Sequence, residues 1–417
     1  MRILGKILNN AEKTKKPVIM LDIGEGTVKV LAIKVDEKDN SKGIIIGQGI
    51  SYQSPGSDIG GASMDFPQIL ATCKEALDKA YKREDSTVLD AVVGISGYVS
   101  RTAVANIIYK RVHPEKAITE DELKNIFEEI NGRVIKKTQE EFVSVSRQDS
   151  YRLLNIAIVE IRIDGYKVSV PLGFQGKEMN FRIITVYAPA SYLKIINTIA
   201  FELRLNVLNT FSLPFAMAKI YQNTANGFGG IIIDVGYETT TVSVVQDNAM
   251  AGIKTFSIGG AAFTRTIARK LNLDFKAAED MKIQYGLRKL LPESDEKVSQ
   301  ILNNIVLLWY RGVKKSLLDF SVTELVSGKI YITGGGSVLP EISKVLNTGD
   351  LRNNLPIIEM ICVNQLNPLA EAGNIFSDSY IDPAEFNGAI SLASFFFNYS
   401  GGKQNMDKFL LEKIENK

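Results

Sequence analysis

Two short segments repeat one pattern about 210 residues apart, and this repeat constrains the fold more than any other feature of the chain. Residues 22–29 read DIGEGTVK, and residues 234–241 read DVGYETTT. Each segment directly follows an apolar run, at 18–21 in the first case and at 231–233 in the second. Such runs predict buried strands, and the glycine and threonine behind each aspartate predict a tight hairpin turn. The sequence therefore predicts one strand-and-hairpin device used twice.

The residue types in these hairpins suit a phosphate group accompanied by a metal ion. Backbone N–H groups and hydroxyls at a tight turn can converge on a phosphate. An ionised aspartate only accepts hydrogen bonds, and hydrated Mg²⁺ is commonly held by one or two carboxylates. We therefore expect Asp22 and Asp234 to face the water shell of a bound metal ion. For a single segment of this kind, an ordinary strand turn would be the favoured interpretation.

A third glycine segment, residues 332–337 (ITGGGS), follows the strand-like residues 329–331. Two hairpins and a later glycine-rich turn, in this order, resemble the actin-like ATPase superfamily. The resemblance implies an α/β protein in which two ribonuclease-H-like α/β domains flank a nucleotide cleft. It also implies ATP and Mg²⁺ as the bound ligands.

Length and composition are compatible with such a protein. The 417 residues suffice for two domains with sizeable cores, and the hydrophobic content of 45% is ordinary for a globular chain. A net charge of +2 gives no indication of nucleic acid as a partner. The two cysteines exclude a disulfide framework, which favours the cytosol, and the single histidine excludes a multi-histidine metal site. No apolar run reaches the roughly 18 residues of a transmembrane helix.

The pattern of the chain, together with the types of subdomain that the resemblance implies, predicts five parts. In order they are a candidate N-terminal amphipathic anchor (1–16), a first actin-like α/β subdomain (17–103), an inserted small α+β subdomain of the SHS2 type (104–205), a second actin-like α/β domain (206–400) and a flexible tail (401–417). A charged helix of the insertion is expected to begin behind the cap-like Thr119. The second domain is expected to carry helical stretches at 261–291 and 296–318 and an apolar helix at 389–397.

Within the superfamily, the insertion resembles that of the bacterial cell-division protein FtsA, where a strand runs into a Pro-x-Gly-x-x-Gly loop, here at residues 171–176. Residues 56–61 (GSDIGG) and 277–286 (AAEDMKIQYG) also resemble FtsA. The competing relative is PilM, the actin-like component of type IV pilus machines. The two residues between Gly24 and Thr27, and the segment FSIGG before residue 261, look more like PilM. A sugar-kinase-type enzyme of the same superfold is a third hypothesis, against which the FtsA-like insertion argues.

The resemblance implies which residues would contact the nucleotide. The hairpins would clamp the phosphates, and Lys29 would meet a phosphate or remain solvated. Glu279 and Lys282, three apart on one helical face, would contact the ribose and adenine or form a surface ion pair. The expected nucleotide-binding residues are Asp22, Gly24, Gly26, Thr27, Lys29, Asp234, Gly236, Thr239, Thr240, Gly259, Gly260, Glu279, Lys282, Gly334, Gly335, Gly336 and Ser337.

Some residues depart from the FtsA pattern. Tyr237 and Glu238 stand where FtsA has glycines in the second hairpin, and Glu25 stands in the first. A carboxylate aimed at a triphosphate repels it, so we expect these side chains to face away or nucleotide binding to be weakened. Residues 212–218 (SLPFAMA), where a water-activating residue would be expected, contain no carboxylate. We therefore expect at most a slow ATPase or a nucleotide-stabilised scaffold, and we assign no catalytic residue.

Both ends of the chain hold a candidate amphipathic helix for a membrane surface. The C-terminal one, around residues 406–414, has an apolar stripe, but Glu412 and Glu415 weaken its attraction to anionic lipid. The first eight residues are the other candidate. Four aliphatic side chains fall on one helical face there, beside Arg2 and Lys6, as in an interfacial amphipathic helix. Resemblance to FtsA implies a filament-forming scaffold, peripheral on the inner face of the cytoplasmic membrane. Its implied partners are the tail peptide of FtsZ, a tubulin homologue, and divisome proteins. Resemblance to PilM implies instead a PilN-type peptide held by the insertion.

Overall fold

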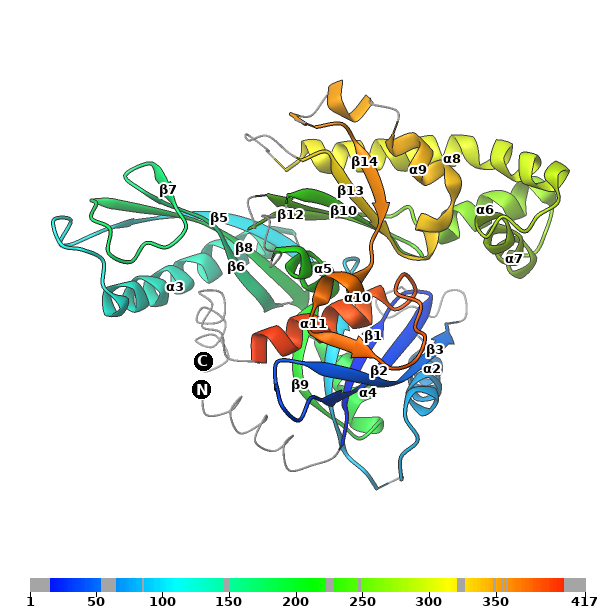
Figure 1. Cartoon of the computed structure of the whole chain (residues 1–417), viewed down its shortest axis with the longest axis horizontal. Coiled ribbons are helices and arrows are strands. Elements are labelled where there is room, and N and C mark those ends of the chain that lie inside the picture. The colour runs from blue at the N-terminus through cyan, green and yellow to red at the C-terminus, as the bar shows by residue number, and fades with distance from the viewer. Residues whose placement is uncertain are drawn as a thin grey trace.

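A computed structural model of the chain describes residues 16–53, 65–84, 86–145, 150–222, 229–246, 249–320, 327–347, 350–353, 356–357 and 359–400. Two α/β units lie one above the other in Figure 1, and a smaller unit extends to one side of them. The predicted anchor, the predicted tail and the FtsA-like segment 56–61 lie outside the described residues, apart from Lys16.

The first unit is built on a six-stranded sheet with the order β15-β3-β2-β1-β4-β9. Its strands are β1 (Val18–Ile23), β2 (Thr27–Val35), β3 (Gly43–Tyr52), β4 (Leu89–Ile95), β9 (Leu205–Ser212) and β15 (Ile375–Ser377). Its helices are α2 (Phe66–Ala80), α4 (Ala190–Glu202), α5 (Leu213–Gln222), α10 (Pro368–Ala372) and α11 (Asn387–Ser400). β1 pairs antiparallel with β2 through the predicted hairpin, and β4 runs parallel on the other side of β1.

The side chains of β1 enter two different cores, because successive residues of a strand point to opposite faces of the sheet. Ile19, Leu21 and Ile23 pack in a core with residues of α2 and α4. Val18 and Met20 lie in a larger core that includes α5 and α11. Helices therefore cover both faces of the strand that carries Asp22, which explains why its sequence is apolar throughout rather than alternating.

The second unit repeats this design on a five-stranded sheet with the order β12-β11-β10-β13-β14. Its strands are β10 (Gly230–Val235), β11 (Thr240–Gln246), β12 (Ala249–Phe256), β13 (Lys329–Thr333) and β14 (Cys362–Gln365). Its helices are α6 (Gly260–Leu271), α7 (Phe275–Gly286), α8 (Pro292–Leu318) and α9 (Pro340–Leu346), with 3₁₀ turns η1 (Gly335–Val338) and η2 (Asp350–Asn353). The strand sequence β3-β2-β1-β4 of the first sheet matches β12-β11-β10-β13 of the second, in order and direction. The predicted duplication is confirmed.

The helical stretch predicted at 261–291 is wrong as one helix. It divides into α6 and α7 because Asn272 adopts a left-handed conformation, with φ of 53°, at the end of α6. The carboxylate of Asp274 then accepts the N–H of Ala277 at 2.8 Å and starts α7. The helix predicted from 296 begins one turn earlier, at Pro292.

The insertion forms a four-stranded antiparallel sheet with the order β5-β8-β6-β7, and helix α3 (Glu120–Val145) packs beside it. The strands are β5 (Arg101–Lys110), β6 (Tyr151–Ile163), β7 (Tyr166–Val168) and β8 (Glu178–Pro189). The hydroxyl of Thr119 accepts the N–H of Glu122 at 3.2 Å, so the predicted helix cap is confirmed. This small sheet and its helix form an α+β unit.

The chain returns to the first sheet twice after leaving it. β9 pairs parallel with β4, and β15 pairs parallel with β3, although both follow residue 204. The sheet of the first unit is therefore completed by residues from the range 206–400. The boundary predicted at 206 does not coincide with the edge of this sheet.

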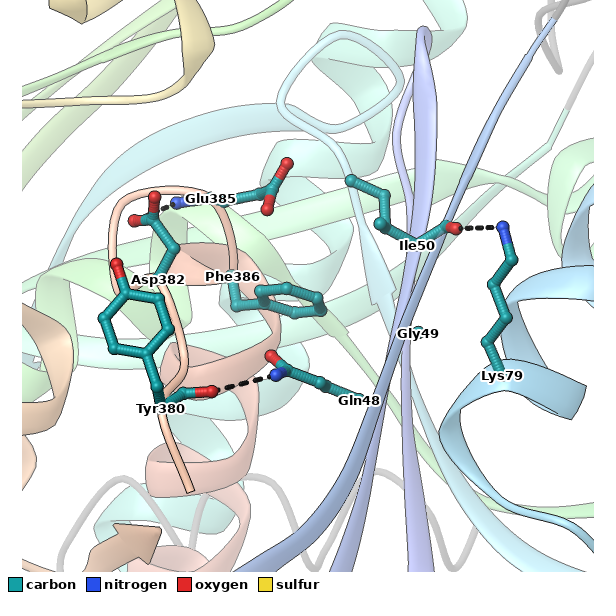
Figure 2. Close-up of a pocket in the computed structure, with 8 residues that line it drawn as sticks. All are labelled: Gln48, Gly49, Ile50, Lys79, Tyr380, Asp382, Glu385 and Phe386. Atoms are coloured by element: carbon teal, nitrogen blue, oxygen red, sulfur yellow. Dashed lines mark hydrogen bonds between the residues drawn. The ribbon is translucent and has the colours of Figure 1, made fainter. Parts of the chain in front are cut away.

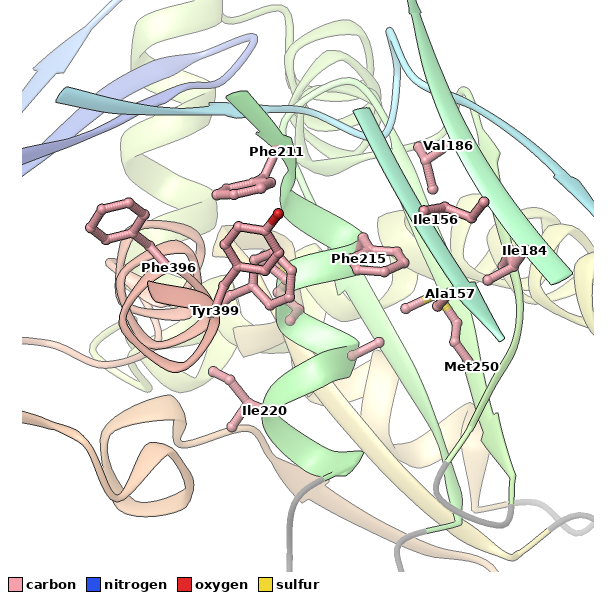
Figure 3. Packing of buried hydrophobic residues seen from close by; sticks show 14 of the residues in the cluster. Ile156, Ala157, Ile184, Val186, Phe211, Phe215, Ile220, Met250, Phe396 and Tyr399 are labelled. Atoms are coloured by element: carbon pink, nitrogen blue, oxygen red, sulfur yellow. The ribbon is translucent and has the colours of Figure 1, made fainter. Parts of the chain in front are cut away.

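One hydrophobic core joins all three units. Figure 3 shows Phe211 and Phe215 beside Tyr399 of α11, with Ile156 and Val186 of the insertion and Met250 of β12 close by. The ring of Phe395 lies 4.9 Å from that of Phe211 and 5.6 Å from that of Phe215, both in edge-to-face contact. The apolar helix predicted at 389–397 is thus a core element, packed against α5 and β9.

Candidate nucleotide site

Both predicted hairpins form two-residue turns that have the same backbone bond. The N–H of Gly24 donates to the carbonyl of Thr27 at 3.0 Å, and the N–H of Gly236 donates to that of Thr239 at 2.9 Å. Asp22 pairs across the first hairpin with Lys29, and Asp234 pairs across the second with Thr241. The turns are equivalent parts of the two duplicated sheets.

The two aspartates lie at the ends of their strands, in a shared electrostatic environment. Asp22 is only 6% exposed, and burial raises the pKa of its carboxyl, against the effect of Lys29. Burial likewise raises the pKa of Asp234 to about 6, with Lys29 opposing this shift and Asp22 adding to it. Lys29 therefore acts on both carboxylates, and each unit contributes one acidic group to the same region.

Helix α6 holds the second hairpin from behind. The N–H groups of Gly260 and Ala261 donate to the carbonyls of Gly236 and Tyr237, both at 2.8 Å. A Cβ at Gly259 would lie 2.5 Å from the carbonyl oxygen of Tyr237, so no larger residue fits there without a shift of the backbone. The predicted Gly259 and Gly260 thus support the hairpin.

The two predicted threonines of this hairpin point to different sides. Thr239 faces the first hairpin, as described below. Thr240 is fully buried, and its hydroxyl donates to the carbonyl of Ile258 at 2.7 Å and accepts the indole N–H of Trp309 at 2.9 Å. The hydroxyl of Thr240 is therefore bonded within the second unit.

The glycine turn after β13 lies directly against the strand that carries Asp234. Gly334 has φ of 82° and ψ of 160°, a region open only to glycine, and a Cβ there would collide with the carboxylate of Asp234. A Cβ at Gly336 would lie 2.5 Å from the side chain of Val235, whereas one at Gly335 would meet nothing within 4 Å. The hydroxyl of Ser337 donates to the carbonyl of Gly334 at 2.8 Å and closes the turn.

Glu279 and Lys282 form an ion pair behind the second hairpin. The two charged groups lie 2.8 Å apart, and the ammonium also donates to Thr264 at 2.9 Å and to the carbonyl of Gly260 at 3.2 Å. Lys282 is only 5% exposed, and burial lowers its pKa while Glu279 opposes that shift. The pair is not a surface pair, because it ties α7 to the first turn of α6.

The acidic residues of the hairpins behave differently from each other. Glu238 turns outward to Arg265, whose guanidinium donates to both carboxylate oxygens at 2.7 and 2.8 Å. Glu25 turns toward the second hairpin, where it accepts hydrogen bonds from the backbone of Glu238 and the hydroxyl of Thr239. The expectation that these side chains face away from the site therefore holds for Glu238 and not for Glu25.

Sequence reasoning missed a third segment that reaches Asp22. Gly388 is the second residue of helix α11, and a Cβ there would collide with the Asp22 carboxylate. The side-chain amide of the neighbouring Asn387 donates to the hydroxyl of Thr333, at the end of β13, at 2.6 Å. The only sequence signal was an Asn-Gly pair before an apolar helix, which does not reveal its neighbours.

A separate cavity of about 350 Å³ lies within the first unit, between β3, Lys79 of α2 and the segment before α11 (Figure 2). Gln48 donates to the carbonyl of Tyr380 at 2.9 Å on one side, and Lys79 donates to that of Ile50 at 2.9 Å on the other. No hairpin residue lines this cavity.

Comparison with known proteins identifies relatives. A family model described as Cell division protein FtsA matches residues 231–368. The FtsA protein of Enterococcus faecalis is 24% identical over 345 residues, covering 77% of this chain and 74% of its own length. That of Streptococcus pneumoniae is 24% identical over 268 residues, covering 64% of this chain and 55% of its own. Among solved structures, the PilM-PilN type IV pilus biogenesis complex matches with a TM-score of 0.64 at 17% identity, over 91% of this chain and 98% of that one.

The chain is similar to FtsA over much of its length and has the actin-like ATPase fold. This confirms the predicted fold class and the predicted resemblance. The FtsA relatives support an actin-like role in cell division, whereas the likeness to the pilus complex establishes the fold alone. None of the helices in the described part of the chain is both long enough and apolar enough to cross a membrane.

Proposed function

We propose that this FtsA-related chain is an ATP-binding, actin-like scaffold that acts in cell division. The observation that carries the proposal is the pair of aspartate-bearing hairpins, one from each α/β unit, which contact each other at the junction of the units. A triphosphate held by both turns would couple the positions of the two units, which is the usual basis of a nucleotide-dependent switch.

The acidic residues fit a divalent cation. Burial raises the pKa values of Asp22 and Asp234, and a nearby Mg²⁺ would favour their ionised forms and offset the charge of the triphosphate. Among the described residues, no group of three or more acidic, histidine or cysteine side chains is arranged to hold a metal ion. Two carboxylates therefore suit an ion that keeps most of its water shell and is shared with a phosphate.

The glycine turn fits the adenosine end of the ligand. A Cβ at Gly335 would meet no atom within 4 Å, so this glycine borders open space, while Gly334 and Gly336 pack inward. Glu279 is more exposed than Lys282, its partner in the ion pair, and lies behind the second hairpin. We propose that Gly335 and Glu279 line the position of the nucleoside, and that Thr27, Lys29 and Thr239 contact phosphates.

Hydrolysis is expected to be slow. Helix α5 begins at Leu213, and the residues 212–218 around its start provide no carboxylate or amide side chain to orient a water molecule. The backbone N–H of Ser212 is already bonded to the side chain of Asn155 at 2.9 Å. Turnover well below the common enzymatic range of roughly 1 to 1000 per second is the expected result.

We further propose the partners and place that an FtsA-like role entails. These are self-association into filaments, a tail peptide of an FtsZ-like tubulin homologue, other divisome proteins, and peripheral attachment to the inner face of the cell membrane. The names of the relatives as cell division proteins support this assignment. A PilM-like role with a PilN-type peptide is the alternative that the two-residue turn between Gly24 and Thr27 favours.

The test of ATP binding uses titration calorimetry of the full chain with ATP in Mg²⁺ and in EDTA. Asp22→Ala and Asp234→Ala should each weaken the Mg²⁺-dependent affinity at least about tenfold. Asp90→Ala is a matched control, because Asp90 lies on the neighbouring strand β4 at the opposite end of the sheet from Asp22 and pairs with Asn206. Unchanged ATP affinity in both aspartate variants would refute the site.

A second experiment separates the two partner hypotheses. The full chain is tested for binding to an FtsZ tail peptide and to a PilN-type peptide under the same conditions. The proposed role predicts retention of the FtsZ peptide only. Retention of the PilN-type peptide alone would favour the pilus role instead.

A further inference from the structure

Glu25 bridges the two hairpins of the proposed nucleotide site. Its carboxylate accepts the backbone N–H of Glu238 at 3.0 Å and the hydroxyl of Thr239 at 3.2 Å. Beside this bridge, the ring of Tyr237 lies against Gly26, where a Cβ would come within 2.5 Å of the ring. The two turns are therefore in direct contact through one side chain from each.

The groups that Glu25 occupies are the ones that a phosphate would use. A carboxylate and a phosphate both present anionic oxygen acceptors, and both bind backbone N–H groups at tight turns. The second hairpin offers the N–H of Glu238 and the hydroxyl of Thr239 at its tip. These donors cannot serve Glu25 and a phosphate oxygen fully at the same time.

Gln53 holds the turn that carries Glu25. The backbone N–H of Gln53 donates to the carbonyl of Gly26 at 3.0 Å, and the side-chain amide of Gln53 donates to that of Gly24. The other glutamate of the two turns, Glu238, is bound by Arg265 and does not compete with Glu25 for the hairpin donors. The contact is thus specific to one carboxylate on a well-supported turn.

We propose that Glu25 is an internal ligand of the second hairpin, which holds the site closed and sets its affinity for nucleotide. The inference rests on the proposed nucleotide binding and adds a residue that controls it. In the free protein the carboxylate satisfies the hairpin donors, and it leaves them when a triphosphate binds. The apparent affinity for nucleotide is then the affinity of the open form multiplied by the fraction of free molecules that are open.

The contact is one that a ligand can displace. Burial raises the pKa of Glu25 to about 7, and its two hydrogen bonds to the second hairpin offset only part of that effect, while the nearby Glu238 and Asp234 add to it. Desolvation of the carboxylate therefore opposes the contact and offsets part of what the hydrogen bonds contribute.

The experiment compares the wild-type chain with Glu25→Ala and Glu25→Gln by calorimetric titration with Mg-ATP. If the hairpin is closed in about nine of ten free molecules, Glu25→Ala should bind roughly tenfold more tightly. Glu25→Gln keeps the shape and one acceptor oxygen but loses the charge, so it should show a smaller gain in the same direction. This isosteric variant also serves if the alanine variant does not fold.

Asp90→Asn is the control, because it removes one negative charge at the opposite end of the sheet from Asp22 and touches no hairpin donor. It should change the affinity less than twofold. A gain equal to that of Glu25→Gln would show a general charge effect and overturn the inference.

Hydrogen exchange without nucleotide gives a readout independent of ATP. The peptide that covers residues 236–241 should exchange faster in Glu25→Ala than in the wild type, because the N–H of Glu238 loses its acceptor. ATP binding by the wild type with no gain in Glu25→Ala overturns the inference while the proposed function stands. Absence of ATP binding in every variant overturns the proposed function, and this inference with it.

Discussion

Replacing Gly334 by alanine should destabilise the second unit far more than the same change at its neighbour. Two separate effects act at Gly334. Its backbone, with φ of 82° and ψ of 160°, lies in a region essentially restricted to glycine. An added Cβ would also lie 2.5 Å from the carbonyl oxygen of Val235 and collide with the carboxylate of Asp234.

The chain provides glycines that separate these effects. Gly173 has φ of 82° but open space around its Cβ position, so alanine there should cost about 1 to 2 kcal/mol from the backbone alone. Gly336 has no positive φ but would crowd Val235, so alanine there should cost about 1 to 3 kcal/mol. Gly334 combines both, which gives about 2 to 5 kcal/mol in the unfolding free energy. Gly335 has neither, and its change should stay within about 0.5 kcal/mol.

Thermal unfolding followed by circular dichroism measures this series. With roughly 2 to 4 °C per kcal/mol for a domain of this size, Gly334→Ala should lower the transition on the order of 10 °C, and Gly335→Ala should leave it nearly unchanged. Because the collision displaces Asp234, Gly334→Ala should also weaken Mg-ATP binding. Equal transition temperatures for the Gly334 and Gly335 variants would refute this reasoning about the turn.

Three further predictions concern buried polar groups. Folding raises the pKa of Asp234 to about 6, so the folded state holds the carboxyl proton more tightly than the unfolded state does. In EDTA, the stabilisation from this proton should be present near pH 4 and be lost as the pH rises through 6, which lowers the free energy of unfolding by up to about 3 kcal/mol. Asp234→Asn should flatten this pH dependence in denaturant titrations. Glu279→Ala leaves the ammonium of Lys282 buried without its carboxylate and should cost about 3 kcal/mol, whereas Lys282→Met should cost clearly less in the same assay; equal losses would contradict the account. Trp309→Phe removes the bond to Thr240 and should cost at least about 1 kcal/mol in urea unfolding, and no loss would show that this bond is unimportant.

The two hairpins could be predicted from the sequence because their causes are local. An apolar run of three or four residues followed by glycine and threonine specifies a buried strand and a tight turn without reference to the rest of the chain. The repeat at 234–241 also predicted the duplicated sheets, because the same local pattern formed the same pairing, with Asp22 opposite Lys29 and Asp234 opposite Thr241.

The completion of the first sheet could not be predicted in this way. β9 and β15 join it because of packing against β4 and β3, and neither strand carries a signal that names its partner. The break between α6 and α7 did have a local signal. Asn272 and Asp274 are a typical helix end and helix start, although the helical periodicity on both sides concealed them.

The site shows the same division between local and long-range causes. Strand alternation implies that Thr239 and Thr240 point to opposite sides, so the sequence alone could have separated them. The direction of Glu25 could not be predicted, because it depends on how closely the second hairpin approaches the first. The approach of Gly388 to Asp22 likewise results from the packing of α11 across the junction of the units.

The most direct test of the central claim is a crystal structure of the full chain grown with Mg²⁺ and a non-hydrolysable ATP analogue. The account predicts the phosphates between residues 24–27 and 236–239, the metal ion on the side of Asp22 and Asp234, and the carboxylate of Glu25 displaced from the second hairpin. An analogue bound elsewhere, or hairpins still joined through Glu25 at a saturating concentration of the analogue, would contradict it.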